Sequence, residues 1–355
     1  MQRAVELARL SEGYTRPNPP VGAVVVKDGR TIGEGRHEYA GGPHAEVAAL
    51  DSCSESPEGA AIYVTLEPCS THGRTPPCTE RIIKEQLDRV VVGCEDCFEK
   101  HRGAGLRILK EHGLEVLSGV CANDTLELVT PFFKHVDTGL PFLTLKLGMT
   151  LDGCIADRTG RSQWITGADS RAEVQRMRRR ADAVMVGSQT VISDDPSLLC
   201  RDYDADNLMR VVVDSKGAIS ASSRILTDQA AERTIVFTSV ETPVAIIDAW
   251  RSNGSVVELL KPAPNGSLSV KDILRELGSM NLMHVLCEGG GGLAGALHAE
   301  KQVDEYALFY APAVLGDLKA RRGFAGTDAS PLAEMDRLKI RDLRRFGDDI
   351  CVRLR

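Results

Sequence analysis

Short apolar runs alternate with stretches of helical periodicity along most of this chain, and this alternation constrains the fold more than any other feature. It is typical of layered α/β domains, in which helices cover a sheet. The pattern is interrupted once, between His135 and Pro141, and a new strand-like run begins at Phe142. The chain has 355 residues, which exceeds the size at which a single hydrophobic core usually stops growing. The sequence therefore predicts two α/β domains, residues 1–139 and 140–355.

The first domain shows a regular order of elements. Asp28-Gly29 lies between two strand-like runs. Because this pair tolerates the positive φ of a tight turn, it predicts a hairpin of residues 21–27 and 31–35. Apolar, β-branched runs predict strands at 60–66 and 89–93. Helical periodicity predicts helices at 2–13, 78–87 and 103–112.

The second domain repeats this alternation without detectable repeats or low-complexity segments. We expect helices at 169–180 and from about residue 292. The strands expected in this domain are 142–147, 183–187, 210–214, 234–238, 282–287 and 303–310.

Composition narrows the class of protein. Apolar residues make up 43% of the chain and charged residues 26%, as in ordinary globular proteins. The formal net charge of −7 argues against nucleic acid as the main partner, because such binding depends on Lys and Arg. The sequence shows neither a long apolar span nor a signal peptide, so we expect a cytoplasmic protein that does not insert into membranes. Its ten cysteines are then expected to be reduced thiols, some of them metal ligands.

Three short motifs of the first domain supply the donor atoms of a zinc site. They are Pro43-His44-Ala45-Glu46, Glu67-Pro68-Cys69 and Pro76-Pro77-Cys78. Zinc favours nitrogen and sulfur ligands, and three protein ligands leave a fourth position for water, as in catalytic sites. Taken singly, a His or a Cys is more often a packing residue than a ligand. Together, His44, Cys69 and Cys78 predict a catalytic zinc site.

Glu46 is the expected proton carrier of this site. Hydroxide attack on a pyrimidine ring must be coupled to protonation of the ring nitrogen and of the departing amine, and a carboxylate beside the metal can move both protons. His44 and Glu46 are two residues apart, so we place them at a helix start after Gly41-Gly42-Pro43. Cys78 follows two prolines and should also open a helix, whose positive end favours a thiolate.

Other Cys and His residues of this domain admit rival interpretations. Cys94 and Cys97 have the spacing of a redox pair or of half a zinc site, but the chain has no second Cys pair to complete one, and we interpret them as incidental thiols. His72 and His101 are interpreted as loop residues.

The second domain contains weaker signals. Gly290, Gly292 and Gly295 follow an apolar run and precede a helical stretch, so exposed amides there are suited to a phosphate. The acidic residue expected about twenty positions later in a Rossmann unit is absent, and we reject that fold. Arg176, Arg178, Arg179 and Arg180 form a basic run that is usually a solvated helix face. Trp164 either stacks on a ring or fills the core, and the residues alone favour the core.

The first domain resembles that of the bifunctional riboflavin-biosynthesis deaminase/reductases. Zinc deaminases of nucleobases share His-x-Glu and Pro-Cys, usually with a second Cys three positions later. Here the gap is nine positions, from Cys69 to Cys78, and Glu67 to Cys78 matches this riboflavin family closely, as does Pro17-Asn18-Pro19. The resemblance implies a cytidine-deaminase-like α/β/α fold and deamination of 2,5-diamino-6-(5-phosphoribosylamino)pyrimidin-4-one. It makes Asn18 and Arg74 candidates for base and phosphate contacts.

One loop departs from the family pattern. The family commonly has Asp-Pro-Asn-Pro after the strand that ends near Gly93, whereas this chain reads Asp96-Cys97-Phe98-Glu99. Phe98 therefore stands at the Asn position, and the substrate contacts of this loop stay open.

The second domain resembles the reductase half of the same family. The matching motifs are Lys146 to Gly153, Ser162 to Thr166 and Asp194-Asp195-Pro196. The resemblance implies a dihydrofolate-reductase-like α/β fold and hydride transfer from NADPH to C1′ of the ring-opened ribose. It implies NADPH contacts by Gly148, Trp164, Thr190, Asp194, Ser215 and the run Gly290, Gly291, Gly292, Leu293, Ala294, Gly295 and Ala296. It implies substrate contacts by Ser162, Arg178, Leu198, Arg201 and Glu288.

Within these contacts, Arg178 and Arg201 suit the substrate phosphate, because guanidinium groups pair with it in a bidentate way. Lys146 is a candidate proton donor or phosphate contact. The sequence leaves the oligomeric state open, and a homo-oligomer is compatible with it.

Two rival functions remain. The first is a zinc deaminase of another nucleobase with an inactive second domain, which the acidic charge and the reductase-like motifs disfavour. The second is a zinc-stabilised binding module, which leaves a three-ligand site beside a free Glu46 unexplained.

Overall fold

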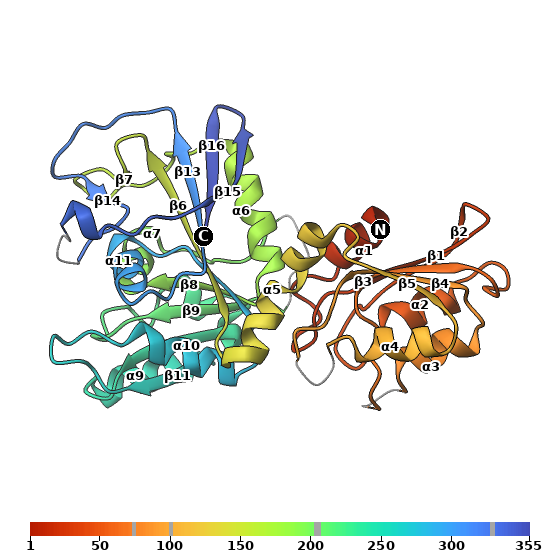
Figure 1. The fold of residues 1–355 in the computed structure, drawn as a ribbon. Helices are drawn as coiled ribbons and strands as arrows, with labels where there is room; N and C mark the ends of the chain where they lie inside the picture. Colours follow the sequence, from red (N-terminus) through yellow and green to blue (C-terminus); the bar gives the residue numbers. More distant parts are fainter. Residues whose placement is uncertain (73–75, 99–101, 202–206, 327–330) are drawn as a thin grey trace. The chain divides into compact units, whose positions relative to one another are not determined.

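The computed structural model describes residues 1–72, 76–98, 102–201, 207–326 and 331–355. The chain divides into two compact units, Met1–Gly139 and Leu140–Arg355. Each unit has its own sheet and its own hydrophobic core. Both are three-layered α/β units (Figure 1).

The sheet of the first unit has five strands in the order β2-β1-β3-β4-β5. β1 is antiparallel to β2 and β3, whereas β3, β4 and β5 are parallel. The strands are β1 (Gly22–Lys27), β2 (Arg30–Arg36), β3 (Ala61–Leu66), β4 (Arg89–Cys94) and β5 (Glu115–Ser118). The helices are α1 (Gln2–Arg9), α2 (Ala45–Asp51), α3 (Cys78–Lys84), α4 (Ala104–Glu111) and α5 (Ala122–Thr138).

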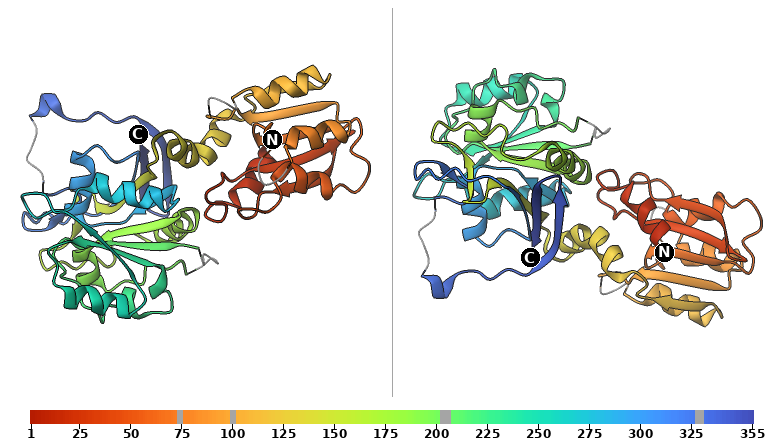
Figure 2. Two further views of the ribbon diagram at one scale, coloured as in Figure 1. Left: turned by 90° about the horizontal axis from the view of Figure 1, so that it is seen from below. Right: turned by 90° about the horizontal axis from the view of Figure 1, so that it is seen from above.

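Helices cover both faces of this sheet (Figure 2). Apolar residues of α2, α3 and α4 pack on one face, and those of α1 and α5 on the other. The packing is close at Gly35, where a Cβ would lie 2.2 Å from the backbone nitrogen of Ala49 in α2. This close approach fixes α2, and with it the His44-Ala45-Glu46 motif at its start, against the sheet.

The sheet of the second unit has nine strands in the order β11-β10-β9-β8-β12-β6-β13-β16-β15. Neighbours are parallel from β11 to β13, and the last two strands form an antiparallel hairpin at the edge. The central strands are β8 (Ala183–Gly187), β12 (His284–Cys287), β6 (Phe142–Thr150) and β13 (Glu305–Ala311). The outer ones are β9 (Met209–Val213), β10 (Thr234–Ser239), β11 (Val256–Leu260), β15 (Ile340–Phe346) and β16 (Asp349–Leu354). A separate pair joins β7 (Cys154–Ala156) and β14 (Arg321–Arg322).

Two helical layers enclose this sheet. α10 (Val270–Ser279) and α11 (Gly291–Ala299) pack on one face through the largest apolar cluster of the unit. The opposite face contacts α7 (Ser188–Asp194), α8 (Arg224–Thr227) and α9 (Val244–Ser252), and α6 (Ala168–Arg180) covers β13 and β16. The carboxyl ends of β6, β8, β9 and β12 therefore open between helices, where the site of this unit lies.

Most predicted elements are confirmed, with different ends. The hairpin at Asp28-Gly29 forms with φ of 50° and 75° at the two turn residues. The first helix ends at Arg9, not at residue 13. The stretch near His135, where the sequence pattern is interrupted, lies at the end of α5, an unpredicted helix that continues to Thr138 with Pro131 inside it. The pattern missed α5, α7 to α10, β5, β7, β11 and the β14 to β16 segments.

Candidate functional sites

The three expected metal ligands meet in the first unit. His44 Nδ1 lies 3.5 Å from Cys69 Sγ and 3.3 Å from Cys78 Sγ, and all three donor atoms lie within 4.8 Å of one another. Zn–N and Zn–S bonds of about 2.0 and 2.3 Å at a tetrahedral angle place nitrogen and sulfur about 3.5 Å apart. The observed separations therefore fit a single zinc ion. Among the described residues, this is the one His/Cys/Asp/Glu group of three found at such spacing.

Helix starts position two of these three residues, as the sequence predicts. His44 is the N-cap of α2, and Cys78 is the first residue of α3. The Cys78 backbone N–H donates to Cys69 Sγ at 3.2 Å. Hydrogen bonds from the Cys78 thiol, and secondarily from His44 and this amide, lower the pKa of the Cys69 thiol well below its usual range. The thiol pair therefore already favours one thiolate, the form that binds metal.

Glu46 lies in the first turn of α2 and is only 4% exposed. Burial raises the pKa of its carboxyl to about 7, and a hydrogen bond with Cys78 opposes this shift. The carboxyl group is thus adjacent to the donor cluster without being part of it.

His37, which the sequence analysis did not single out, connects two parts of this site. Its Nδ1 is 2.9 Å from the Pro43 carbonyl oxygen, so Nδ1–H donates there and Nε2 accepts from Asn18 Nδ2 at 3.0 Å. Burial lowers the pKa of His37, which favours this neutral form. Its ring also meets the His44 ring edge-on, with centroids 5.6 Å apart. The signal in the sequence was weak, since a single His after a strand is common.

A buried carboxylate holds the loop where the chain departs from the family pattern. Glu67 accepts hydrogen bonds from the backbone nitrogens of Asp96, Gly103 and Gly105 at 3.1, 2.9 and 2.9 Å. Phe98, next on this loop, is 41% exposed. Arg74, Glu99 and His101 lie outside the described residues.

The other thiols and His72 stay apart from this chemistry. All ten cysteines are free. Burial raises the pKa of Cys94 to about 12 and that of Cys97 to about 11, opposite to the shift that activates a redox thiol. His72 lies near Glu80 at the surface, with 3.8 Å between Nε2 and Oε1.

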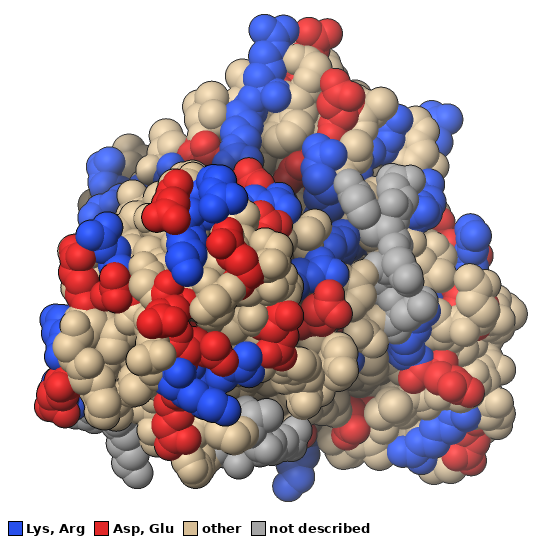
Figure 3. Space-filling view, turned by 90° about the vertical axis from the view of Figure 1, so that its right-hand side faces the viewer, with Lys and Arg blue, Asp and Glu red and all other residues tan. Residues whose placement is uncertain are grey.

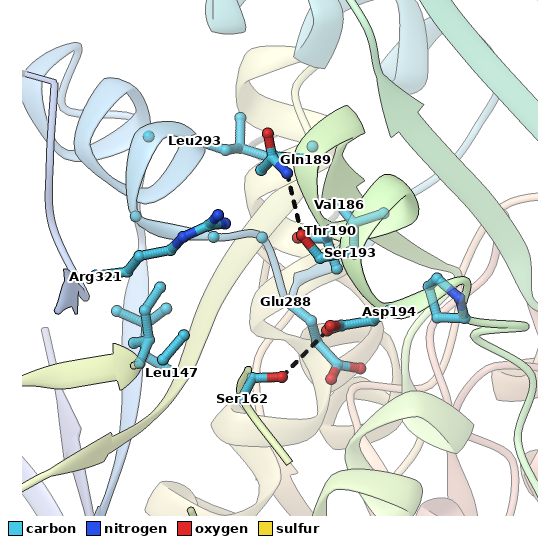
Figure 4. Close-up of a pocket in the computed structure, with 18 of the residues that line it drawn as sticks. Leu147, Ser162, Val186, Gln189, Thr190, Ser193, Asp194, Glu288, Leu293 and Arg321 are labelled. Carbon is cyan, nitrogen blue, oxygen red and sulfur yellow. Dashed lines mark hydrogen bonds between the residues drawn. The ribbon is translucent and has the colours of Figure 1, made fainter. Parts of the chain in front are cut away.

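The second unit contains a cavity of about 1010 Å³ at the carboxyl ends of its central strands (Figure 4). Fifteen of the seventeen residues expected from the family resemblance to contact cofactor or substrate line it. They are Gly148, Ser162, Trp164, Arg178, Thr190, Asp194, Leu198, Arg201, Ser215, Glu288, Gly290, Gly291, Gly292, Leu293 and Ala296. Ala294 and Gly295 do not reach it. Ala294 is buried in the core, and a Cβ on Gly295 would lie 2.0 Å from the Ala325 carbonyl oxygen.

Glu288 is the charged centre of this cavity. Its Oε1 accepts from Arg178 Nε at 2.6 Å, and its Oε2 lies 3.2 Å from Arg178 Nη2 and 3.8 Å from Lys146 Nζ. Burial alone would raise the pKa of Glu288, but the charges of Arg178 and Lys146 lower it overall. Burial in turn lowers the pKa of Lys146. Arg178 belongs to the basic run of α6, and its side chain faces the cavity.

The mouth of the cavity corrects one expectation. Trp164 is 64% exposed and does not fill the core; the Arg171 Cζ lies 4.5 Å from its ring centroid. Ser162 Oγ donates to Asp194 Oδ2 at 3.3 Å across the cavity (Figure 4). A flat ring and two polar groups therefore face the same space.

The glycine run has two distinct roles. A Cβ on Gly292 would meet nothing within 4 Å, so this residue opens onto the cavity at the start of α11. A Cβ on Gly291 would instead lie 2.2 Å from the Arg322 carbonyl oxygen. The Gly-x-Gly-x-x-Gly pattern thus combines an open helix N-terminus with close contact to a later segment, and the sheet around it is not a Rossmann unit.

Comparison with known proteins identifies both units. Residues 1–94 match the family described as the cytidine and deoxycytidylate deaminase zinc-binding region, and residues 141–352 match the RibD C-terminal domain. The riboflavin biosynthesis protein RibD of Aquifex aeolicus (strain VF5) is 39% identical, over 99% of this chain and 96% of the relative. That of Escherichia coli (strain K12) is 37% identical, over 100% and 98%.

Solved structures agree with these matches. The crystal structure of a diaminohydroxyphosphoribosylaminopyrimidine deaminase/5-amino-6-(5-phosphoribosylamino)uracil reductase from Thermotoga maritima superposes with a TM-score of 0.88. It is 38% identical and is covered over 97% of its chain and 100% of this one. The fold is therefore a cytidine-deaminase-like unit followed by a dihydrofolate-reductase-like unit, as predicted. Within the described ranges, the helices are all too short or too polar to traverse a bilayer.

Proposed function

We propose that the two units of this chain, which belongs to the RibD family of riboflavin-biosynthesis proteins, each carry one of its two activities, at the two sites described above. The chain is a bifunctional, zinc-dependent deaminase and NADPH-dependent reductase. It removes the amine from 2,5-diamino-6-(5-phosphoribosylamino)pyrimidin-4-one and then reduces the ribosyl C1′, which yields 5-amino-6-(5-phosphoribitylamino)uracil. In our proposal His44, Cys69, Cys78 and Glu46 serve the first step, and the Glu288 cavity serves the second.

His44, Cys69 and Cys78 would hold the zinc ion. The support is their donor chemistry and the agreement of their separations with one tetrahedral ion. When bound in such a site, zinc lowers the pKa of a coordinated water to about 7 and so supplies hydroxide at neutral pH.

Glu46 would carry the protons. Its carboxyl group lies beside Cys78, so it can take a proton from the attacking water and deliver it to the ring nitrogen. A second transfer to the exocyclic amine lets ammonia leave. Because Glu46 is buried, few competing waters can take these protons.

The neutral His37 would orient the base-binding side of this site. It fixes the Asn18 amide on one side and the backbone before His44 on the other. Asn18 is then directed to a hydrogen bond with the pyrimidine.

The cavity of the second unit fits a dinucleotide and a phosphorylated pyrimidine. Its volume is at the upper end of ligand sites, and the amides of Gly290 to Gly292 at the start of α11 suit phosphate oxygens. When bound, NADPH supplies the hydride for C1′. Trp164 and Gly148 would line the place of its flat ring, with Ser162, Leu198 and Arg201 facing the substrate.

Around C1′, the Lys146-Glu288-Arg178 cluster would position the ring-opened ribose and supply the proton that accompanies reduction. Lys146 Nζ is the proton-carrying candidate, because burial lowers its pKa and Glu288 lies within 3.8 Å. Arg178 is committed to Glu288 and to the Leu199 carbonyl, which leaves Arg201 better placed for the substrate phosphate.

The observation that carries this assignment is the presence of two complete constellations in separate units. The test is a two-stage assay of the zinc-loaded chain with ammonia release measured without cofactor, then NADPH oxidation on pre-deaminated substrate. Wild type should perform both steps, and Glu46→Gln should lose about a hundred- to ten-thousandfold in deamination while it still reduces. Equal deamination by Glu46→Gln would contradict its role.

A deaminase of another base with an inactive second unit is disfavoured by the cavity, whose lining matches the expected reductase contacts. The same assay distinguishes it, because such a protein would oxidise no NADPH. Acidic and basic side chains are interspersed over the face drawn in Figure 3, which suits a small-molecule substrate better than nucleic acid.

We also infer a cytoplasmic homo-oligomer. Ten free cysteines suit a reducing compartment. The edge strand β15 exposes Ile340 and Leu343 by 64% and 59%, and exposed apolar edges favour association. Light scattering of wild type and Leu343→Asp should show a concentration-dependent assembly that the variant weakens; a monomer at all concentrations would contradict this.

A further inference from the structure

A segment far along the chain closes one side of the reductase cavity. Residues 320–325, here called the strap, include β14, which pairs with β7 through Arg321↔Ala156 and Arg322↔Cys154. The Gly323 N–H donates to the Gly153 carbonyl at 3.1 Å, and the Ala325 N–H donates to the Gly291 carbonyl at 3.0 Å. The strap is therefore fixed both to β7 and to the start of α11.

Glycines let the strap lie directly on α11. Cβ atoms on Gly291 and Gly295 would come within 2.2 and 2.0 Å of the carbonyl oxygens of Arg322 and Ala325. These two positions are one helical turn apart and thus on the same face of the helix. The backbone next to Arg321 is consequently held beside the helix N-terminus that opens onto the cavity.

Most cations that line the cavity are already committed. The described lining contains Lys146, Arg171, Arg178, Arg201, Arg224, Arg321 and Arg322. Lys146 and Arg178 share Glu288, Arg171 covers Trp164 and donates to the Thr166 carbonyl, and Arg322 donates to the Asp152 carbonyl. Within the described part of the chain, Arg201, Arg224 and Arg321 have no carboxylate in ion-pair contact. Three uncommitted guanidinium groups thus face two ligands that together carry a diphosphate and two further phosphates.

Arg321 is the uncommitted cation nearest to α11. Its side chain extends into the cavity between Leu147 and Leu293 (Figure 4). The guanidinium lies over Gly160, where a Cβ would be 2.7 Å from Nη2, so that glycine leaves room for it. Its charge also acts on Asp194 across the cavity.

Position along the sheet separates the three arginines. Arg201 lies beyond Leu198, among the residues expected to contact the substrate. Ser215 follows β9, which β8 separates from β12, so it lies about 10 Å further along the sheet. Arg224 begins α8, and its backbone N–H donates to Asp195 Oδ1 just beyond α7. A dinucleotide whose nicotinamide lies near Gly148 and Glu288 would have its diphosphate at α11 and its adenosine toward β9.

We propose that Arg321 binds the diphosphate of NADPH, together with the backbone amides at the start of α11. The inference rests on the reductase site proposed above and adds a residue from the strap to it. The guanidinium can offer two parallel N–H donors to phosphate oxygens, which the amides alone cannot neutralise.

The experiment compares wild type with Arg321→Met by titrating NADPH and NADH without substrate and following cofactor fluorescence. Loss of a charge-assisted contact should weaken the binding of both cofactors by about ten- to a hundredfold, with their affinity ratio unchanged, because both contain the diphosphate. Lys319→Met is the matched control: it removes a neighbouring charge that does not line the cavity and should change either affinity by less than about twofold.

Each other outcome has a defined meaning. Unchanged affinity in Arg321→Met, or a loss confined to NADPH, overturns the diphosphate contact; the second result would indicate the 2′-phosphate. An equal loss of cofactor affinity in Lys319→Met would mean that any nearby positive charge has this effect, and it would also overturn the diphosphate contact. Failure of wild type to bind either cofactor would refute the reductase site itself. Thermal unfolding and deamination check the variant's integrity, and Arg321→Gln replaces it in the same titration if Arg321→Met unfolds.

Discussion

The two sites of this chain differ in how their residues are distributed. The proposed zinc donors come from two helix starts and one loop, and the sequence positions of His44 and Cys78 differ by 34. The cavity proposed for the reductase is lined by segments from Lys146 to Ala325. A metal site needs few atoms of fixed type at fixed distances, whereas a dinucleotide site needs an extended surface. Substitution of one residue in the metal site should therefore abolish its activity, whereas substitution of one residue in the dinucleotide site should only weaken binding or catalysis there.

The largest effect is expected at a metal ligand. Cys69→Ser replaces a thiolate, which also accepts from the Cys78 amide, by a poorer zinc ligand. Bound zinc and ammonia release should fall below detection, while NADPH oxidation on pre-deaminated substrate stays within about twofold of wild type. Metal analysis and the two assays measure this.

Cys53→Ser is the control for that substitution. Cys53 is a thiol of the same unit that bonds the Ala49 carbonyl and belongs to no donor cluster. It should retain zinc and deamination. Full activity of zinc-free Cys69→Ser would refute the metal site.

The next effect is expected at the centre of the reductase cavity. Glu288→Gln removes the charge shared by Arg178 and Lys146, which leaves two buried cations without a counter-ion. The rate of reduction should fall by about a hundredfold or more, and deamination should not change. Steady-state rates of NADPH oxidation and ammonia release test both halves of this prediction.

Glu173→Gln is the matched control, because Glu173 pairs with Arg176 on the same helix as Arg178 but does not line the cavity. It should reduce normally. If Glu173→Gln and Glu288→Gln lose the same fraction of reductase activity, the loss comes from a destabilised α6 and not from a change in the cavity.

The sequence predicted the compact site much better than the dispersed one. Residue type and position next to Pro and Gly were enough to select His44, Glu46, Cys69 and Cys78 as candidates, because zinc chemistry restricts the ligands so strongly, and the fold brings the three expected ligands together. His37 was missed because its role depends on Asn18 and the Pro43 carbonyl, which only the fold brings to it.

In the second unit, the residues alone favoured the wrong place for Trp164 and gave Gly290 to Gly295 little weight. Periodicity cannot show that the strap, more than twenty residues later in the chain, packs directly on α11. The sequence therefore did not show that these glycines are also needed for this close contact. The edge strand β15 and its partner β16 were missed for a related reason: β15 is mostly exposed and has no regular apolar alternation.

A stability effect should separate the glycines of α11. In Gly295→Ala the new Cβ would lie 2.0 Å from a backbone oxygen of the strap, which cannot yield as a flexible side chain can. We expect a loss of about 2–3 kcal/mol in the unfolding free energy of the second unit. Urea unfolding monitored by the loss of NADPH oxidation would measure the stability of the second unit. Deamination, measured in the same samples, would report on the first unit.

Gly292→Ala is the control, because its Cβ meets nothing within 4 Å. Its unfolding free energy should be unchanged or slightly higher, since Ala favours a helix. Equal destabilisation by both substitutions would mean that the strap does not contact α11 as described.

The smallest effect is a pH dependence confined to the second unit. His284 lies in β12, where Nε2 is 3.0 Å from Thr144 Oγ1. Burial, helped by the charges of nearby arginines, lowers its pKa to about 4. The unfolded chain has an ordinary His pKa of about 6.5, so between pH 6.5 and 4 it binds more protons than the folded chain. The neutral His284 therefore contributes its full stability above about pH 6.5 and loses it progressively as the pH falls to about 4.

Since His284 retains some solvent exposure, we expect about 1–2 kcal/mol from this titration, less than the full pKa shift would give. Urea unfolding of the second unit at about pH 7.5 and pH 4.5, in wild type and in His284→Gln, isolates the contribution as the difference between two differences. Gln retains a polar contact with Thr144 but does not titrate, so its stability should fall less on acidification. Parallel pH profiles for the two proteins would show that His284 is not held neutral. A smaller decline in His284→Gln would instead show that the second unit depends on a buried neutral side chain at neutral pH, as its site depends on a buried charged cluster.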